Sequence, residues 1–347
     1  MSEQHHRGYA DPLATFSVVR IFLTGGTGYL GRELLNELCR RGHDVTALVR
    51  TPQRAPALPA GVRTVSGSVA APASYRGELK GHDALVHLAA LVKMWSRDRA
   101  DFDRVNVEGT EQAILAASDA GIGRIVYASS FMALGPSNGA PLREDDPRRT
   151  TTSHNDYERT KTLADQRLRR FIEEGRPLYV LYPGVLYGPG SLTDGNIIAK
   201  NVILFLNGTM PFGLAIRVWS YAFVEDVVAG FVKVIEGDAP SRRYVLGGDN
   251  RSGAEFYQAL YEVTGKKPPR LNIPLNVAAV AGYGEYLLAR LFGREPKLLT
   301  HEVAQVYKRS WAYDSSRATR ELGYTITPLK EGLAKLVAWL KQTGHVQ

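Results

Sequence analysis

The feature that most constrains the fold is a glycine-rich turn between a short apolar segment and an amphipathic one. Residues 18–24 are rich in β-branched and apolar side chains, which predicts a buried strand. Glycines follow at Gly25, Gly28 and Gly31, and residues 30–41 carry leucines at the spacing of one helix face. Glycines at this spacing let the turn close and bring backbone N–H groups to a pyrophosphate at the helix N-terminus. The sequence therefore predicts a dinucleotide-binding strand–turn–helix unit.

Strand patterns and helix patterns alternate through the following residues. Strands are expected at 44–50, 62–66, 84–88, 124–129, 178–182 and 244–246. Helices are expected at 102–120 and 156–174. Such alternation is typical of βαβ units around a parallel sheet. We predict an α/β, Rossmann-like, doubly wound parallel sheet with a smaller, discontinuous C-terminal substrate lobe.

The pattern loosens near residue 190, which suggests how the 347 residues divide. Residues 1–17 are expected to be a flexible extension, and residues 18–190 the NAD(P)-binding Rossmann domain. A segment at about 222–248 is expected to return to that domain. The substrate lobe with the C-terminal helices takes residues 191–221 and 249–347.

Composition excludes several classes of protein. Cys39 is the only cysteine, so no intrachain disulfide and no cysteine-based metal cluster can form. The net charge is +8, but the basic residues form short scattered clusters without interleaved aromatic residues, so we expect no nucleic-acid partner. The first 17 residues lack the apolar run of a secretory signal, and we expect a cytoplasmic protein.

Arg50 bears on the choice of cofactor. It ends the second predicted strand, where NAD-specific folds usually place a carboxylate for the ribose 2′-hydroxyl. An arginine there can pair with a 2′-phosphate, which favours NADP over NAD. The alternatives are that Arg50 stacks on the adenine or lies in solvent.

Two side chains on the predicted helix at 156–174 suggest the chemistry. Tyr157 and Lys161 are four residues apart and therefore share one helix face. A phenol with a pKa near 10 exchanges protons near neutral pH only if a cation stabilises its phenolate, and Lys161 can provide that cation. Ser130 lies at the C-terminal end of a predicted strand, where ligands gather in doubly wound sheets.

Together these motifs resemble the extended short-chain dehydrogenase/reductase family, also called the NAD-dependent epimerase/dehydratase family, over residues 18–345. Further segments similar to the family's motifs are HLAA at 87–90, NVEGT at 106–110 and YPGVLYGPG at 182–190. The ending LVR at 48–50 and SSFMALGP at 129–136 are most similar to the dihydroflavonol reductase and 3β-hydroxysteroid dehydrogenase-like branch, including farnesol dehydrogenase-like enzymes.

The resemblance implies a role for each site residue. Ser130 would orient the substrate oxygen, Tyr157 would act as general acid and base, and Lys161 would lower the pKa of Tyr157 and bind the nicotinamide ribose. Cofactor contacts are expected from Gly25, Thr27, Gly28, Tyr29, Leu30, Gly31, Arg50, Ser68, Val69, Leu88, Ala89, Ala90, Asn106, Tyr157, Lys161, Pro183, Gly184 and Val185. No metal is expected. The resemblance also implies a homodimer formed through the helices at 102–120 and 156–174.

Two positions depart from the family's pattern. Ser68 stands where an aspartate that contacts adenine is usual, and Phe223 stands where a histidine is usual. Neither residue belongs to the predicted chemistry. Both make the adenine contacts and the junction with the second lobe differ from the common arrangement.

The substrate is expected to be an apolar alcohol or carbonyl compound of isoprenoid, steroid-like or flavonoid type. Apolar residues are expected near it, although many of them can equally be ordinary core: Leu91, Val92, Met94, Trp95, Phe131, Met132, Leu134, Leu186, Tyr187, Phe205, Met210, Phe212 and Trp219. Residues 191–222 carry only Asp194, Lys200 and Arg217 as charges, whereas a sugar diphosphate needs several cations. The alternatives are a nucleotide-sugar epimerase or dehydratase, and a non-catalytic, cofactor-sensing or RNA-associated member of the family.

The longest uncharged apolar stretch, Leu271–Gly284, is interrupted by Pro274 and is too short to span a bilayer. We expect a packing or lid helix there. The alternative is a surface that touches a membrane.

Overall fold

A seven-stranded parallel sheet lies at the centre of the structure, a computed structural model that describes residues 17–346 except 56, 94, 95, 97, 210–212, 215, 238, 270, 271, 274 and 293–300. Its strands are β1 (Arg20–Thr24), β2 (Asp44–Val49), β3 (Arg63–Ser66), β4 (Ala84–His87), β5 (Arg124–Ala128), β6 (Leu178–Pro183) and β10 (Arg243–Leu246). The spatial order is β10-β6-β5-β4-β1-β2-β3. The predicted fold class is confirmed, and the strand expected at 244–246 joins the sheet beside β6.

The sheet changes winding direction between β1 and β4. From β1 the chain proceeds to β2 and β3 on one side and then to β4, β5 and β6 on the other. In open α/β sheets, ligands bind outside the carboxyl ends of the strands at such a point. The turn after β1 and the loop after β4 therefore border the expected ligand crevice.

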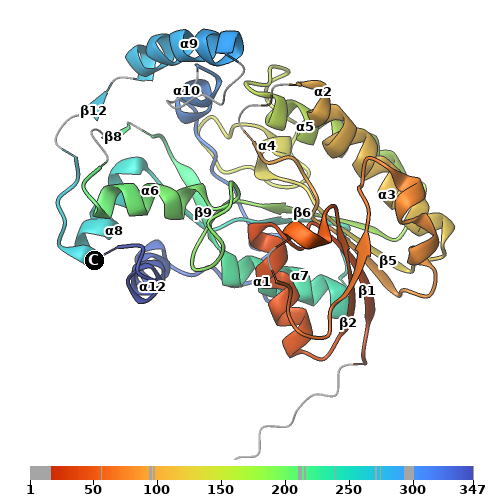
Figure 1. The fold of residues 1–347 in the computed structure, drawn as a ribbon. Helices are drawn as coiled ribbons and strands as arrows, with labels where there is room; N and C mark the ends of the chain where they lie inside the picture. The colour runs from red at the N-terminus through yellow and green to blue at the C-terminus, as the bar shows by residue number, and fades with distance from the viewer. Residues whose placement is uncertain are drawn as a thin grey trace, which may run out of the picture.

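Helices cover both faces of the sheet (Figure 1). Helices α1 (Tyr29–Arg40) and α7 (Val224–Glu236) pack on one face, and α3 (Thr110–Asp119) and α5 (Asp156–Glu173) pack on the other. The alternation of side chains along a strand supplies both cores: Ile21 and Leu23 face α1 and α7, whereas Phe22 faces α3 and α5.

The predicted helix at 102–120 contains a break in its hydrogen-bond pattern. It begins as α2 (Ala100–Asp103), continues as the π-helical turn η4 (Arg104–Gly109) and ends as α3. Turns of this type are rare, and they occur frequently at functional sites. Residues of the NVEGT segment lie in and directly after this turn.

A second lobe lies beside the sheet, at the left of Figure 1. Its three-stranded sheet has the order β11-β9-β7, and β8 pairs with β12. The strands are β7 (Val185–Tyr187), β8 (Gly213–Leu214), β9 (Trp219–Phe223), β11 (Asp249–Arg251) and β12 (Asn272–Ile273). The remaining α-helices of the described residues are α4 (Phe131–Leu134), α6 (Ile197–Leu206), α8 (Gly253–Thr264), α9 (Leu275–Phe292), α10 (His301–Tyr307), α11 (Ser316–Leu322) and α12 (Leu329–Gln342). Short 3₁₀ helices lie at η1 (Pro52–Arg54), η2 (Pro72–Ser74) and η3 (Arg76–Leu79).

Helix α9 takes up most of the apolar stretch 271–284. Leu271 and Pro274, which precede the helix in that stretch, lie outside the described part of the chain. The helix packs against α10 and exposes Val277, Val280 and Tyr283, with Val280 76% exposed. Among the described helices, none is both long enough and apolar enough to cross a membrane. The flexible extension expected at 1–17 also falls, up to residue 16, outside the described residues.

Candidate active site

The glycine turn after β1 leaves no room for larger side chains. Gly25 has a φ of +80°, and a Cβ added there would lie 2.6 Å from the backbone nitrogen of Ala89. A Cβ added at Gly31 would collide with the carbonyl oxygen of Gly25. The turn, the start of α1 and the loop after β4 therefore touch backbone to backbone, as the glycine spacing predicts.

Helix α1 begins with amides that no side chain caps. Gly28 occupies the N-cap, and no side chain of the described residues accepts a hydrogen bond from the first turn. Such a terminus attracts anions because its N–H groups are unsatisfied and the helix dipole is positive there. The cradle at Gly25 and Gly31 together with this terminus fits the pyrophosphate of a dinucleotide.

The loop after β4 is held in place by side chains from both sides. Leu88 donates a backbone hydrogen bond to the carbonyl oxygen of Thr24 over 3.1 Å, and Ala89 donates one to its hydroxyl over 3.3 Å. Asn106, fully buried in η4, accepts from the backbone nitrogen of Leu91 at 2.7 Å and donates to Thr160 Oγ1 at 3.1 Å. The polar atoms of Asn106 thus position this loop against α5.

At the expected adenine end, the structure places Arg50 in solvent directly after β2. It forms no hydrogen bond or ion pair with any described residue. Ser68 uses its hydroxyl to accept a 3.3 Å hydrogen bond from the backbone nitrogen of Ala70, and Val69 is buried. Arg32, in the first turn of α1, donates to the carbonyl oxygen of Ala57 at 2.6 Å and so brings the loop after β2 next to the glycine turn.

The segment expected to hold the nicotinamide links the two sheets. Pro183 ends β6, and Gly184 donates a backbone hydrogen bond to Leu246 of β10 at 2.9 Å. Val185 then begins β7 and pairs with Tyr221 of β9. The segment therefore runs from the central sheet into the second lobe, along the crevice predicted by the strand order.

Ser130 and Tyr157 come together at the carboxyl end of β5. Ser130 is the buried N-cap of α4, and its hydroxyl accepts a 3.3 Å hydrogen bond from the backbone nitrogen of Met132. Tyr157 lies in the first turn of α5, which is capped by Asn155, and its phenol lies near Ser130. Burial raises the pKa of Tyr157 to about 12, and the interaction with Ser130 opposes that shift.

Lys161 is buried one turn further along α5, with 2% of its surface exposed. Its Nζ donates to the carbonyl oxygen of Ala128 at 2.8 Å and to the hydroxyl of Tyr127 at 3.2 Å. It lies 6.0 Å from the centre of the Tyr157 ring. Burial lowers the pKa of Lys161 to about 7.

The turn that carries Ser130 is fixed by contacts that the sequence did not reveal. Arg148 donates to the carbonyl oxygens of Met132 and Ala133 at 2.8 and 3.2 Å. Its other nitrogen binds the fully buried carboxylate of Glu158 at 2.5 Å. Burial raises the pKa of Glu158, and its bonds to the backbone of His154 and to Arg148 oppose that shift.

Aromatic side chains continue from Ser130 into the second lobe. The Phe131 ring meets Trp311 edge-on, with ring centres 5.5 Å apart, and lies 5.8 Å from Tyr313. Trp219 bridges to Trp311 through the backbone and lies 4.9 Å from Tyr307. We call Phe131, Trp219, Tyr307, Trp311 and Tyr313 the aromatic cluster. The indole N–H of Trp219 is buried without a partner among the described residues.

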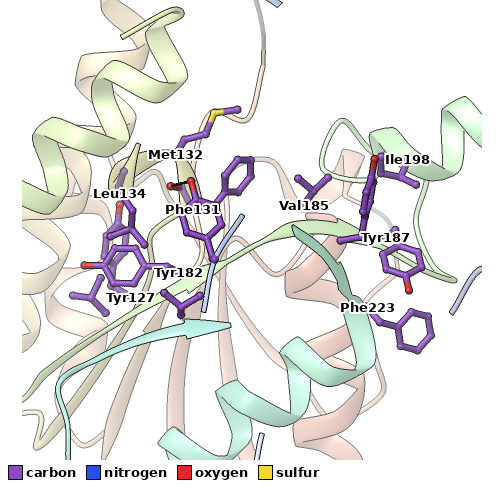
Figure 2. Packing of buried hydrophobic residues seen from close by; sticks show 14 of the residues in the cluster. Tyr127, Phe131, Met132, Leu134, Tyr182, Val185, Tyr187, Ile198 and Phe223 are labelled. Atoms are coloured by element: carbon purple, nitrogen blue, oxygen red, sulfur yellow. Dashed lines mark hydrogen bonds between the residues drawn. The ribbon is translucent and has the colours of Figure 1, made fainter. Parts of the chain in front are cut away.

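Other residues expected near the substrate are distributed between core and surface. Figure 2 shows Leu134 with Tyr127 and Tyr182 near the central sheet, and Tyr187 with Ile198 and Phe223 in the second lobe. Tyr187 and Phe205 are buried in that packing, whereas Val92 is exposed. Met94, Trp95, Met210 and Phe212 lie outside the described residues.

The charges of residues 191–222 do not form a cationic site. Asp194 and Lys200 pair with each other at 2.9 Å, and Arg217 is exposed. The described residues also contain no group of three or more acidic, histidine or cysteine side chains able to hold a metal ion.

Known proteins are similar to this chain over nearly its whole length. A profile of the NAD dependent epimerase/dehydratase family matches residues 21–247. Sterol demethylase protein B of Methylococcus capsulatus is 28% identical, covering 93% of this chain and 99% of that protein. The 4-hydroxy-2-methyl-3-oxo-4-farnesyl-3,4-dihydroquinoline-1-oxide ketoreductase of Stigmatella aurantiaca is 31% identical, and the match covers 88% of this chain and 92% of that protein. The structure of MoeE5 in complex with UDP-glucuronic acid and NAD superposes with a TM-score of 0.71 at 25% identity, and the match covers 93% of this chain and 99% of that chain.

Proposed function

Because the chain belongs to the NAD dependent epimerase/dehydratase family and is an NAD-dependent oxidoreductase, we propose that it interconverts an apolar alcohol and its carbonyl compound. The observation that carries this proposal is the junction of Ser130 and Tyr157 with the aromatic cluster. Phe131, the residue after Ser130, packs against Trp311 and Tyr313, so the proton-handling groups adjoin a buried apolar cluster.

Ser130, Tyr157 and Lys161 divide the tasks of the proposed reaction. Ser130 donates a hydrogen bond to the substrate oxygen, and Tyr157 accepts the substrate's hydroxyl proton in oxidation and returns it in reduction. Lys161, 6.0 Å from the Tyr157 ring, stabilises the phenolate and binds the nicotinamide ribose. The nicotinamide, when bound, supplies or accepts the hydride. The glycine turn and the start of α1 hold its pyrophosphate.

The substrate we favour is an isoprenoid, steroid-like or other polycyclic alcohol or ketone. The names of the two relatives describe a sterol demethylase protein and a ketoreductase of a farnesylated dihydroquinoline oxide. Among the described residues, the aromatic cluster contributes no cation, and Arg217, the cation of 191–222 that forms no ion pair with a described residue, is exposed. This composition suits an extended apolar molecule better than a sugar diphosphate.

A chain-length series tests the substrate class. We expect kcat/KM to rise several-fold per added methylene along C5, C10 and C15 isoprenoid alcohols, because each buried CH₂ contributes roughly 0.8 kcal/mol. UDP-glucose and UDP-glucuronic acid, assayed with the same cofactor, are expected to remain unconverted. A flat series with conversion of a UDP-sugar would reject the proposal.

The second candidate, a nucleotide-sugar epimerase or dehydratase, is favoured by one observation. MoeE5, whose structure contains UDP-glucuronic acid and NAD, matches 93% of this chain. Such an enzyme would turn over without net consumption of cofactor. Absorbance at the nicotinamide band, followed during conversion of each substrate, distinguishes the two reactions.

We further propose that NADP is preferred over NAD. Arg50 is free of partners among the described residues and exposed at the end of β2, where a guanidinium can pair with a 2′-phosphate. Arg50→Ala should weaken NADP binding by roughly 1.5–3 kcal/mol and leave NAD binding almost unchanged. Calorimetric titration with both cofactors measures this difference, and equal losses would indicate that Arg50 stacks on the adenine.

A further inference from the structure

Tyr127 contacts the Lys161 ammonium with its side chain, and the expected chemistry gives it no task. It lies on β5, three positions before Ser130, and is fully buried. Lys161 Nζ donates to its hydroxyl at 3.2 Å and lies 4.8 Å from the centre of its ring. No other side chain of the described residues is within hydrogen-bond distance of this ammonium.

The contact with Tyr127 limits where the Lys161 ammonium can donate its remaining hydrogen bond. An ammonium has three protons to donate. One goes to the carbonyl oxygen of Ala128 and one to Tyr127, both on β5. These two contacts fix the direction of the third proton before any ligand arrives, in a side chain that otherwise has many rotamers.

Tyr127 is itself held by further polar groups behind it. Its hydroxyl interacts with Thr110, whose Oγ1 is 3.1 Å from Nε2 of His87. Nδ1 of His87 is 2.9 Å from the hydroxyl of Thr24, the last residue of β1 before the glycine turn. The buried groups therefore form a line from the glycine turn to the Lys161 ammonium.

The two titratable groups behind the Lys161 ammonium, His87 and Tyr127, keep their protonation states across the neutral pH range. Burial and the nearby Lys161 lower the pKa of His87 to about 3, so its ring is neutral. Burial raises the pKa of Tyr127 far above its usual value, with Tyr157 and Asp165 adding to the rise. Lys161 is the one group among these with a pKa near neutral, at about 7.

We propose that Tyr127 is a positioning residue for Lys161, whose ammonium it holds together with the Ala128 carbonyl so that the third proton is left for the cofactor ribose. This inference rests on the proposed role of Lys161 as a ribose ligand. A hydrogen bond accepted from an ammonium favours its charged form. Tyr127 therefore also keeps Lys161 charged at pH values where burial alone would leave it neutral.

The test is the pH dependence of NAD binding, measured by calorimetry from pH 5.5 to 9. NAD is used because it lacks the 2′-phosphate, which titrates near pH 6. In the unchanged protein, the dissociation constant should begin to rise near pH 7, where Lys161 loses its proton. We call the pH at which the dissociation constant begins to rise the bend of the binding curve. In Tyr127→Phe, this bend should move to lower pH by about one unit, the shift expected from losing one hydrogen bond to a charged group. Affinity at pH 8 should then be about tenfold weaker, with little change at pH 5.5.

The matched control is Tyr182→Phe. Tyr182 is equally buried on the neighbouring strand β6, but its hydroxyl contacts Asp165 and Arg243. This variant loses a buried tyrosine hydroxyl without touching Lys161, so its bend should stay near pH 7. Thr110→Val, which removes the hydroxyl behind Tyr127, should move the bend in the same direction by a smaller amount and serves if Tyr127→Phe does not fold.

Lys161→Met distinguishes a failure of the proposed ribose-binding role of Lys161 from a failure of the proposed positioning role of Tyr127. If it leaves NAD affinity and its pH dependence unchanged, the proposed role of Lys161 is wrong. If it removes the bend while neither Tyr127→Phe nor Thr110→Val moves it, the role of Lys161 stands and the positioning role of Tyr127 is overturned.

Discussion

The two sides of the candidate active site are built from different kinds of contact. On the side of the central sheet, Ser130, Lys161 and Glu158 are each fixed by directional hydrogen bonds. On the side of the second lobe, Phe131, Trp219 and Tyr307 meet other rings at centre distances of 4.9–5.8 Å. The indole N–H of Trp219 has no partner among the described residues.

This difference reflects two tasks. Proton transfer needs donors and acceptors within a few tenths of an ångström of their working positions, and only hydrogen bonds and ion pairs impose such order. Recognition of an apolar molecule needs area and shape, which aromatic rings supply with little directional constraint. Substitutions on the first side should therefore change turnover, and those on the second side should change substrate preference.

The largest effect is expected from Tyr157→Phe. Removing the hydroxyl that exchanges the proton should lower turnover by ~10²–10⁴-fold while NAD binding survives, because the glycine turn, the start of α1 and Lys161 keep their contacts with the dinucleotide. Steady-state kinetics and calorimetric titration measure the two effects. Tyr179→Phe, a tyrosine of β6 flanked by Arg124 and Arg242, should keep near-normal turnover. Near-normal turnover by Tyr157→Phe would contradict the assignment.

Arg148→Met should have the next largest effect. It leaves the buried carboxylate of Glu158 without its cation, which costs about 3–5 kcal/mol of unfolding free energy. It also frees the carbonyl oxygens of Met132 and Ala133, so turnover should fall roughly tenfold or more. Denaturant unfolding measures the loss of stability, and steady-state kinetics measure the loss of turnover.

The stability loss in Arg148→Met should shrink as the pH falls through the raised pKa of Glu158, where the unpaired carboxylate becomes protonated. Burial raises the pKa of Glu158 above its unfolded value, so the folded state binds more protons than the unfolded state in that range, and stability decreases as pH rises. Arg143→Met is the control, because Arg143 is exposed, and ion pairs of exposed side chains are worth about 1 kcal/mol or less. A loss in Arg148→Met no larger than in this control would show that the pair does not hold the turn.

The smallest effect, and the one confined to the second lobe, is expected from Trp219→Phe. The smaller ring should lower kcat/KM for a C15 isoprenoid alcohol by roughly five- to thirtyfold and hardly change that for a C5 alcohol, because only the longer chain reaches it. Trp339→Phe, on α12 beside His345, should leave both values unchanged. Equal losses for the two chain lengths would show that the two sides of the site do not divide these tasks.

The sequence predicted the parts of the site whose spacing is local. Tyr157 and Lys161 share a helix face because they are four residues apart, and the glycines at 25, 28 and 31 act within one turn. The hydrogen bonds from Tyr313 to the backbone of Phe131 and Gly135 join residues about 180 positions apart, and no local pattern announces them. The roles expected of these residues from the resemblance stay predictions.

The sequence patterns did not predict two parts of the structure, and each has an identifiable reason. Every residue of β9 is buried, so the strand lacks the alternation that marks a strand in sequence, and the polar β11 that pairs with it shows no apolar pattern. From the sequence we also predicted that the Lys161 ammonium lies next to the Tyr157 phenol. In the structure, the phenol nearest to this ammonium is that of Tyr127. A strand tyrosine next to an apolar run gives no sign of which neighbouring element its hydroxyl will meet.

The π-helical turn at 104–109 has a consequence for insertions and deletions. An α-helix advances by about 100° per residue, so one residue more or less rotates everything downstream to a different face. Here the wider turn sets the phase between Asn106, which holds the loop after β4, and Thr110, which contacts His87. Deleting a single residue between them would preserve a helix but turn Thr110 away from its partner, so this stretch should tolerate substitution far better than any change in length.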